Sequence, residues 1–333
     1  MIIKSIKLVN FRNHQEYFLD CHKDTTLIIG DNGFGKTSIL EAIYILTRGK
    51  SFRATDAEII NRDSDFYRIE LEYQNGEIIT ATFNGQEKYF HILDKKSKRI
   101  PKNNKYPVVL FLPSDLNLIS HSPGRRREYF DRIFSQLSEN YSSYLLKYEK
   151  ALKQRNEILK QEYQTKDSLF SWNIMLAEYG TKILKLRQKY IKEFNQKLTN
   201  IYQSIAENQD QIEIIYKTDS KTTKMEDYLK QLEQNYEKDS YLGHTSFGIH
   251  RDDYVFEFNH KIADGSASRG ETRSIILALK FIEADLIYQK TNLRPLILLD
   301  DVFSELDTTR RRSLTKNFKH NQIIITSVET IKT

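Results

Sequence analysis

The chain has 333 residues, 39% of them hydrophobic, and 51 Lys and Arg against 45 Asp and Glu give it a net charge of +6. This length allows one large core or two smaller ones, and the modest positive charge permits a polyanionic partner without requiring one. Because the only cysteine is Cys21, no Cys/His cluster has zinc-site spacing, and no signal peptide or membrane-length apolar run is recognisable, we expect a cytosolic protein without disulfides.

The first 93 residues predict strands and one helix. Apolar segments at 2–9 and 25–29 predict strands, the second leads directly into a glycine, and a helix is expected from Thr37. Beyond that helix, apolar and polar residues alternate at 67–73, and further strand-like segments follow after Asn-Gly pairs. Because Asn-Gly supplies the positive φ angles of tight hairpins, this region predicts an antiparallel meander.

The middle third predicts helices. Between Gly124 and Gly243 the only glycine is Gly180, and none of the five prolines falls there. Apolar residues recur at spacings of three and four over 130–152 and over 172–201, which predicts two long amphipathic helices with aromatic core faces.

Strand-like segments return after residue 242. They lie at 255–258, 296–299 and 322–325, with a helix expected around 272–288. We therefore predict an α/β head made of residues 1–123 and 243–333, whose two halves complete one sheet, interrupted by a mostly helical lobe at 124–242.

A phosphate-binding motif lies between the second strand and the first helix. The residues Gly30-Asp31-Asn32-Gly33-Phe34-Gly35-Lys36-Thr37 match the pattern G-x-x-x-x-G-K-[ST] in the context that it requires. Its glycines let backbone amides face the phosphates, Lys36 reaches the β and γ oxygens, and the Thr37 hydroxyl is a ligand for Mg²⁺. The motif predicts ATP and Mg²⁺ as cofactors.

Two acids, Asp300 and Asp301, follow the apolar strand at 296–299. Such acids can simply cap the next helix, but together with the phosphate-binding loop they predict catalysis. Asp300 is then expected to hold Mg²⁺ together with Thr37, and Asp301 is expected to orient the attacking water. Lys36, Asp300 and Asp301 are the candidate catalytic residues.

Two further motifs resemble those of ABC ATPases. Ser268-Arg269-Gly270-Glu271 resembles the signature motif, and Ser304-Glu305-Leu306-Asp307 resembles the D-loop. The order of motifs is that of the Rad50, SMC and RecF group, which implies an α/β fold with an ABC-type P-loop ATPase head, an antiparallel β meander and a mostly helical second lobe. The resemblance also implies that Ser268, Gly270 and Asp307 contact nucleotide, and that ATP is held between two subunits of a homodimer.

Several stretches narrow this resemblance to the RecF family, and they span nearly the whole chain in the family's order. The resemblance implies an ATP-dependent protein that binds DNA at gaps or junctions and helps RecO and RecR load RecA in repair and replication restart. It also adds Arg12, Asn13 and Ser38 to the nucleotide-binding candidates. The stretches are Leu8-Val9-Asn10-Phe11-Arg12-Asn13, Ser51-Phe52-Arg53, Phe111-Leu112-Pro113-Ser114-Asp115-Leu116, Ser122-Pro123-Gly124-Arg125-Arg126-Arg127, His250-Arg251-Asp252-Asp253 and Leu299-Asp300-Asp301-Val302-Phe303-Ser304-Glu305-Leu306-Asp307.

Some positions depart from these patterns. The commonest signature has Gln where this chain has Glu271, and Thr326 follows the last strand where transporter ATPases place a switch histidine. We therefore expect weak, DNA-stimulated ATP hydrolysis, with Thr326 taking the histidine's place by hydrogen bonding. His250 and Arg251 are expected to have a structural or interlobe role, because no D-F-G motif accompanies them as in protein kinases.

Basic residues outside these motifs are candidates for DNA binding. Along the predicted helix at 172–201 a lysine stripe lies roughly 120° from the apolar stripe, and two other clusters precede that helix. We expect these residues to contact phosphates without sequence preference. They are Lys95, Lys96, Lys98, Arg99, Arg125, Arg126, Arg127, Lys182, Lys185, Lys189 and Lys192.

Three other kinds of ATPase remain as alternatives. A Rad50-like or SMC-like head needs longer arms than this insertion offers. A membrane-transporter ATPase subunit needs the switch histidine and a smaller helical insertion. An ATPase-coupled nuclease needs an acidic metal-binding domain beyond the ATPase, for which the chain has no room after the D-loop and last strand.

Overall fold

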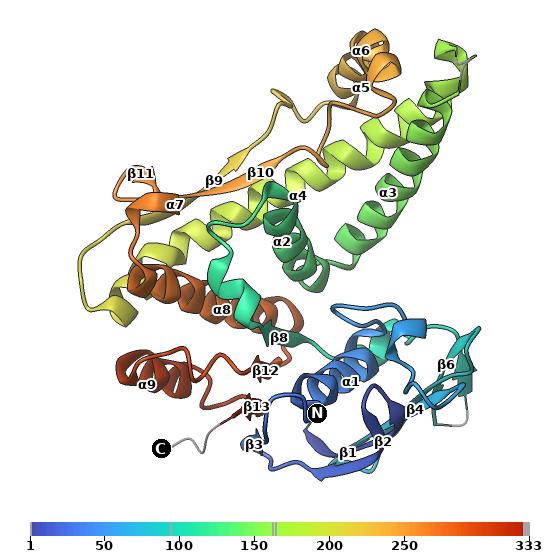
Figure 1. The fold of residues 1–333 in the computed structure, drawn as a ribbon. Coiled ribbons are helices and arrows are strands. Elements are labelled where there is room, and N and C mark those ends of the chain that lie inside the picture. Colours follow the sequence, from blue (N-terminus) through green and yellow to red (C-terminus); the bar gives the residue numbers. More distant parts are fainter. Residues whose placement is uncertain (1, 94, 162, 164, 329–333) are drawn as a thin grey trace. The chain divides into compact units, whose positions relative to one another are not determined.

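The computed structural model describes residues 2–93, 95–161, 163 and 165–328, and the contacts within it divide the chain into two compact units (Figure 1). Unit 1 comprises Met1–Asp115 and Glu283–Thr333, and unit 2 comprises Leu116–Ile282. The predicted lobe boundaries at 123 and 242 follow changes in sequence pattern and stay a prediction. The contact-based division differs from them mainly in placing residues 243–282 with the helical unit.

A parallel sheet lies at the centre of unit 1. Its strands stand in the order β3 (Thr25–Ile29), β13 (Ile323–Ser327), β12 (Leu296–Asp300) and β8 (Val108–Phe111). Every residue of β8, β12 and β13 is buried, as expected of a parallel sheet covered on both faces. Since β3 and β8 precede the insertion and β12 and β13 follow it, the two halves of the chain complete one sheet, as predicted.

An antiparallel sheet accompanies it in unit 1. Its order is β2 (His14–Asp20), β1 (Ile3–Phe11), β4 (Tyr67–Tyr73), β5 (Ile78–Phe83), β6 (Lys88–Ile92) and β7 (Lys95–Ser97). The meander is therefore confirmed. The sequence analysis missed β2 because most of its side chains are at least partly exposed, which leaves a weak apolar pattern.

The helix α1 (Lys36–Arg48) packs between these two sheets. Its side chains Ile39, Leu40, Ile43 and Leu46 are fully buried in one core with residues from both sheets. The remaining elements of unit 1 are η1 (Ala57–Ile59), η2 (Lys102–Asn104) and α9 (Thr308–Asn317), while η3 (Pro113–Asn117) lies at a unit boundary. Because α1 is held on both sides, the loop that precedes it is held in place at the carboxyl end of β3.

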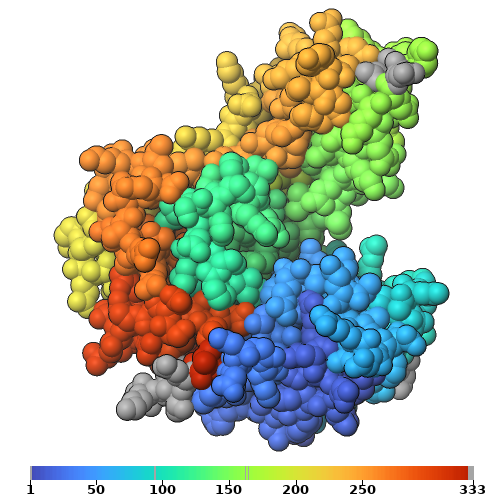
Figure 2. Space-filling view, in the orientation of Figure 1, coloured from blue at the N-terminus to red at the C-terminus, as the bar shows by residue number. Residues whose placement is uncertain are grey.

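Unit 2 consists of helices and a short sheet. Figure 2 shows the orange atoms of α5 and α6 gathered beside the light-green atoms where α3 ends and α4 begins. The sheet has the order β11-β10-β9. The elements are α2 (Pro123–Leu137), α3 (Glu139–Leu159), α4 (Lys166–Ala206), β9 (Ile212–Lys217), α5 (Met225–Gln234), α6 (Tyr236–Leu242), β10 (Asp253–Phe258), β11 (Lys261–Ile262), α7 (Ala263–Ser266) and α8 (Arg269–Thr291), which crosses the boundary of the units.

One prediction about this region was wrong. The apolar stripe over 130–152 belongs to two helices, because Ser138 has an extended backbone (φ −150°, ψ 123°) and its side chain caps α3 by accepting from Tyr141 N. In addition, β10 pairs with β9 in the sheet of unit 2. The strand β9 went unnoticed because it lies in the stretch that lacks glycine and proline.

Candidate nucleotide-binding site

The phosphate-binding loop adopts a conformation that only glycine accommodates easily. Gly33 and Gly35 have φ angles of 90° and 93°, in the left-handed region. A Cβ on Gly35 would also lie 2.4 Å from both Asn13 Oδ1 and His14 Nε2. Asn13 reaches the same loop and donates from Nδ2 to Gly33 O at 2.7 Å. The backbone of the loop is thus set by its glycines and by the end of β1.

The side chain of Lys36 lies inside this loop. It is 7% exposed, and its Nζ donates to Gly30 O at 2.5 Å and to Asp31 O at 3.1 Å. Both acceptors are neutral carbonyls, so the ammonium group has no carboxylate partner in these bonds. Phosphate oxygens are stronger acceptors for a cation than carbonyls are, which makes this amine suited to a phosphate group.

Hydroxyl groups surround the Asp300 carboxylate at the end of β12. Thr37 Oγ1 lies 2.8 Å and 2.9 Å from its two oxygens, and Thr326 Oγ1 donates to Oδ1 at 2.9 Å. Burial raises the pKa of Asp300 above its usual value, while the hydrogen bonds from Thr37 and Thr326 oppose this change. A hydroxyl and a carboxylate oxygen placed together are hard ligands of the kind that Mg²⁺ prefers.

The neighbouring Asp301 has an unusual environment. Its φ angle is 52°, and its backbone N–H donates to Thr326 Oγ1 at 3.0 Å. Within the described residues, its Oδ1 is buried and has no hydrogen-bond partner. A buried carboxylate oxygen without a partner is costly, so this atom is suited to a water molecule or ligand in the site.

These residues line one cavity of 780 Å³ in unit 1. Among the predicted nucleotide-binding residues, the cavity is lined by Arg12, Asn13, Asp31, Asn32, Gly33, Gly35, Lys36, Thr37, Ser38, Asp300 and Asp301. Gly30 adjoins it through its bond to Lys36, Phe34 is a loop residue that is 45% exposed, and Thr326 is buried and donates to Asp300. The cavity is large enough for a nucleoside triphosphate, and its donors and carboxylates fit one bound with Mg²⁺.

The sequence analysis did not predict Arg53 as a lining residue of the cavity, nor the buried acid Glu41 that accepts its hydrogen bonds. Glu41, a fully buried residue on α1, accepts from Arg12, Arg53 and Ser51. Burial alone would raise the pKa of Glu41, but the hydrogen bonds from these three residues together lower it. The stretch Ser51-Phe52-Arg53 was noticed only as a family resemblance. Other unpredicted lining residues are Glu58, Ile60, Asn61, Arg62, Asp63 and Pro113.

The signature and D-loop candidates both lie at helix starts. In unit 2, Ser268 N donates to Glu271 Oε2 at 2.6 Å, and Glu271 N donates to Ser268 Oγ at 3.3 Å, so the pair forms a capping box at the start of α8, where Gly270 also lies. Glu271 in place of Gln therefore serves this cap well. In unit 1, Asp307 caps α9 by accepting from Arg310 N at 2.9 Å, and it does not line the cavity.

The predicted DNA-binding side chains differ in whether they are exposed or already paired within the protein. Arg126 pairs with Asp253 at 2.8 Å and Arg127 donates to Asp252 O at 2.7 Å, so both are engaged inside unit 2, whereas Arg125 is exposed beside Glu128. On α4, Lys182 pairs with Glu178. Besides Arg125, the candidates whose side chains are exposed on the surface are Lys95, Lys96, Lys98 and Arg99 near β7, and Lys185, Lys189 and Lys192 on α4.

No helix in the described part of the chain is long and apolar enough to cross a membrane. Likewise, the described residues contain no group of three or more His, Cys, Asp or Glu side chains that could hold a metal ion.

Comparison with known proteins gives one family. Residues 1–293 match the family model of the AAA ATPase domain. The DNA replication and repair proteins RecF of Clostridium perfringens (strain 13 / Type A) and Clostridioides difficile (strain 630) are 35% and 34% identical, with 98% and 99% of this chain covered and 92% of each relative. The solved structure of the recombination mediator protein RecF-ATP in the RecFOR pathway matches with a TM-score of 0.89 and 28% identity over 100% of this chain and 93% of that one.

A more distant match concerns the fold alone. The SMC head bound to the C-terminal winged-helix domain of ScpA is similar with a TM-score of 0.54 and 13% identity over 99% of this chain and 90% of that chain. The expected fold class, an ABC-type ATPase head with a helical second lobe, is thereby confirmed. Since the curated relatives exceed 30% identity over nearly their full length, this chain, with its ATPase domain, belongs to the RecF family of DNA replication and repair proteins.

Proposed function

We propose that this protein is an ATP-dependent recombination mediator that binds DNA at gaps or junctions. The observation that carries the proposal is the cavity in which the phosphate-binding loop meets Asp300 and Asp301, in a chain of the RecF family. We further propose that ATP with Mg²⁺ occupies this cavity and that the protein acts in the cytoplasm.

The residues of the cavity have distinct tasks in this proposal. Lys36 would exchange its hydrogen bonds to the carbonyls of Gly30 and Asp31 for bonds to phosphate oxygens, and Thr37 and Asp300 would hold the metal. The bound Mg²⁺ neutralises phosphate charge. Asp301 offers its unpartnered oxygen to the attacking water and orients that water for displacement in line with the leaving group.

Hydrolysis is proposed to be slow and to be stimulated by DNA. The neutral hydroxyl of Thr326 holds both Asp300 and the backbone of Asp301 at the position of a switch histidine. A threonine hydroxyl cannot become cationic, so it provides less stabilisation than a histidine for charge that develops on the phosphate. We propose that DNA binds elsewhere on the protein through its phosphates and favours the conformation that hydrolyses ATP.

A second copy of the chain is proposed to complete the site. Ser268 is exposed at the start of α8, and the positive end of the helix dipole at this point attracts anions. In the proposed homodimer this helix start faces the γ-phosphate held by Lys36 of the other copy. ATP then closes the dimer and hydrolysis reopens it, so that nucleotide state controls residence on DNA.

The partners proposed for this protein come from its relatives. A similar solved protein is described as a recombination mediator in the RecFOR pathway. We infer that this chain likewise cooperates with RecO-like and RecR-like proteins at single-strand to double-strand DNA junctions, where they load a RecA-like recombinase.

Light scattering with and without ATP, Mg²⁺ and gapped DNA tests the proposal. The wild-type protein is expected to double in mass only with ATP and Mg²⁺, whereas Ser268→Arg should bind ATP and stay monomeric. Ser143→Arg, which changes an exposed position of α3, is the matched control and should dimerise. Two results would contradict the proposal that a second copy completes the site. One is a mass of the wild-type protein that does not change with ATP, and the other is a dimer of Ser268→Arg.

A further inference from the structure

Side chains of α4 hydrogen-bond the outer edge of β9 in unit 2. The carboxamide of Asn195 donates to Ile214 O and accepts from Ile214 N, both at 2.9 Å. One helical turn later, Thr199 Oγ1 donates to Ile212 O at 2.8 Å and accepts from Ile212 N at 3.2 Å. This hydrogen-bond pattern repeats because the two elements advance by similar amounts. Four residues of a helix rise about 6 Å, and two residues of a strand rise about 6.6 Å.

This series leaves one position of the strand open. Gln203 continues the series in one direction by donating to Asp210 O at 3.1 Å. In the other direction the next outward-facing residue is Tyr216, because backbone groups alternate along a strand and those of Ile214 already face α4. The helix position opposite is Ile191, which cannot hydrogen-bond. Within the described residues, nothing pairs with the Tyr216 N–H and C=O on this edge.

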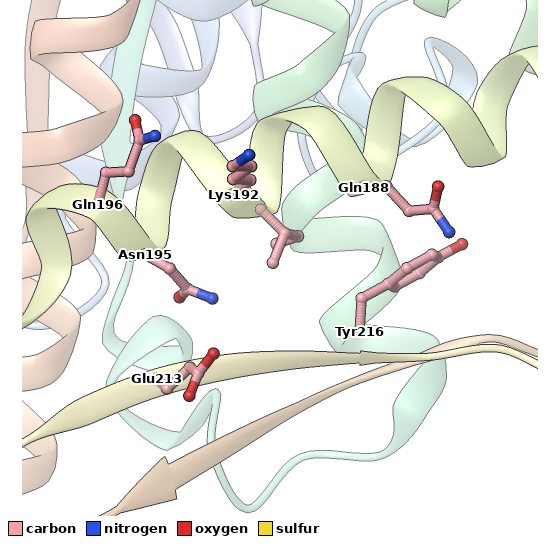
Figure 3. A pocket seen from close by; sticks show the side chains of 7 residues that line it. Gln188, Lys192, Asn195, Gln196, Glu213 and Tyr216 are labelled. Carbon is pink, nitrogen blue, oxygen red and sulfur yellow. The ribbon is translucent and has the colours of Figure 1, made fainter.

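A groove of 510 Å³ lies at this open position (Figure 3). Figure 3 shows Asn195 reaching from α4 toward the strand, with Gln188 and Tyr216 at the same end of the groove. Most of the lining side chains are polar amides or charged groups. The lining residues are Gln188, Ile191, Lys192, Asn195, Gln196, Glu213 and Tyr216.

The rim of the groove is positively charged. Lys185, Lys189 and Lys192 are exposed on α4 on the helix face beside the groove, and Glu213 is the single acid among the lining residues. A ligand with repeated negative charge therefore fits this rim better than a neutral or cationic one.

We propose that the open position at Tyr216 binds one unpaired base of single-stranded DNA, with the adjoining phosphates on Lys185, Lys189 and Lys192. This inference rests on the proposed DNA binding and deepens it. A base edge carries a donor and an acceptor side by side, as the Asn195 carboxamide does where it pairs with both backbone groups of Ile214. Bases inside a duplex have these edges occupied, so the site selects an unpaired base.

An extended peptide is the other occupant that such an edge could take. Peptides that add to a sheet need several successive strand positions. Here β9 ends at Lys217, so Tyr216 is the last outward-facing position of the strand and offers only one pair of hydrogen bonds. The short edge and the lysine rim together favour a base with its phosphates.

Fluorescence anisotropy with gapped duplexes tests the site in the full-length protein with ATP and Mg²⁺. One duplex carries a gap of normal nucleotides and the other carries the same gap with abasic sites, so the two differ in bases and share the phosphates. The wild-type protein should bind the base-bearing gap roughly tenfold more tightly, the order expected for one base contact.

Two variants close the groove in different ways. Gln188→Trp fills it from an exposed helix position, and Ile191→Asn supplies a carboxamide one turn from Asn195 that pairs with Tyr216 itself. Both should bind the two gapped duplexes equally while keeping their affinity for intact duplex. Asn200→Trp, an exposed α4 position outside the groove, is the control and should keep the preference for bases.

The outcomes separate this inference from the proposed function. Two results would overturn the inference and leave the proposed function intact. One is wild-type protein that binds both gapped duplexes equally, and the other is Ile191→Asn protein that still prefers the base-bearing gap. Displacement of the base-bearing DNA by a poly-glutamate peptide as readily as by oligothymidylate would assign the groove to acidic peptides instead. Wild-type protein that binds none of these DNAs overturns the proposed function together with the inference.

Discussion

The hydroxyl of Thr37 donates to the carboxylate of Asp300 at 2.8 Å, although 263 residues separate them in the chain. Thr37 lies in the first turn of α1 after β3, while Asp300 ends β12, and the two strands are joined in one sheet through β13. Because the carboxyl ends of parallel strands meet at one edge of a sheet, the phosphate-binding loop meets Asp300 and Asp301 there. Folding of the discontinuous unit 1 is therefore a condition for nucleotide binding.

Replacement of the loop lysine is expected to remove ATP binding. Lys36→Ala deletes a cation that is buried in the loop and that donates, among the described residues, to the carbonyls of Gly30 and Asp31. Since hydrogen bonds to charged groups contribute about 1.5–3 kcal/mol, affinity should fall at least about tenfold. Isothermal titration calorimetry with ATP and Mg²⁺ measures this change. Lys50→Ala, at an exposed position after α1, should bind as wild type does, and unchanged affinity of Lys36→Ala would refute the assignment.

Replacement of Asp301 by asparagine is expected to trap the ATP-bound dimer. Asn tolerates the φ of 52° found at Asp301, so the loop should keep its shape. The amide lacks the negative charge that orients water, and we expect phosphate release to fall at least about a hundredfold, as for loss of a general base. ATP affinity should stay within a few-fold of wild type. Normal turnover in a phosphate-release assay would remove Asp301 from catalysis.

The sequence predicted those parts of the molecule that short segments specify. The loop around Lys36 and the meander after Tyr67 follow from local patterns, since glycine spacing and alternation act within a few residues. Glu41 escaped notice because a buried acid on an apolar helix is explained only by Arg12 and Arg53, which come from other segments. Tertiary partners of this kind leave no periodic trace in the sequence.

The same reason explains one error and one unexpected ion pair in the helical unit. Ser138 ends α2 and caps α3, yet the buried residues on either side keep the spacing of one continuous helix. Arg126 was expected at the DNA surface because it stands in an arginine triplet, whereas its partner Asp253 lies 127 residues further along the chain. Charge clusters predict surfaces only when no distant acid neutralises them.

Removal of the α4 lysine stripe is expected to weaken DNA binding and flatten its salt dependence. Lys185, Lys189 and Lys192 are exposed, and each phosphate contact that is lost should reduce the slope of log affinity against log salt by about one. Changing all three to Gln should therefore lower the slope by about three on duplex DNA in anisotropy titrations. The same change at Lys147, Lys150 and Lys153 of α3 removes equal charge and should leave the slope unchanged. Equal slopes in both triple variants would exclude the stripe as the DNA surface.

His250 is held as a neutral side chain inside unit 2. Its Nε2 lies 3.0 Å from Thr245 O, which can only accept, so Nε2 carries the hydrogen, and Nδ1 accepts from the Tyr148 hydroxyl at 2.8 Å. Burial lowers the pKa of His250 to about 4 from an ordinary value of 6.5. In its expected structural role, His250 therefore links α3 to the segment before β10 through the hydrogen bonds of its neutral ring.

The lowered pKa of His250 predicts that the protein becomes less stable in mild acid. Below pH 6.5 the unfolded chain gains a proton at this residue and the folded chain does not until the pH nears 4, so stability is lost over that interval. Between pH 7 and pH 5 the loss from this one group should be about 2 kcal/mol. Differential scanning calorimetry at both pH values should show a larger drop in Tm for wild type than for His250→Gln, which lacks the titrating ring. His320→Gln, at an exposed position, should follow wild type, and parallel Tm changes in all three proteins would show that His250 is not titrating in this way.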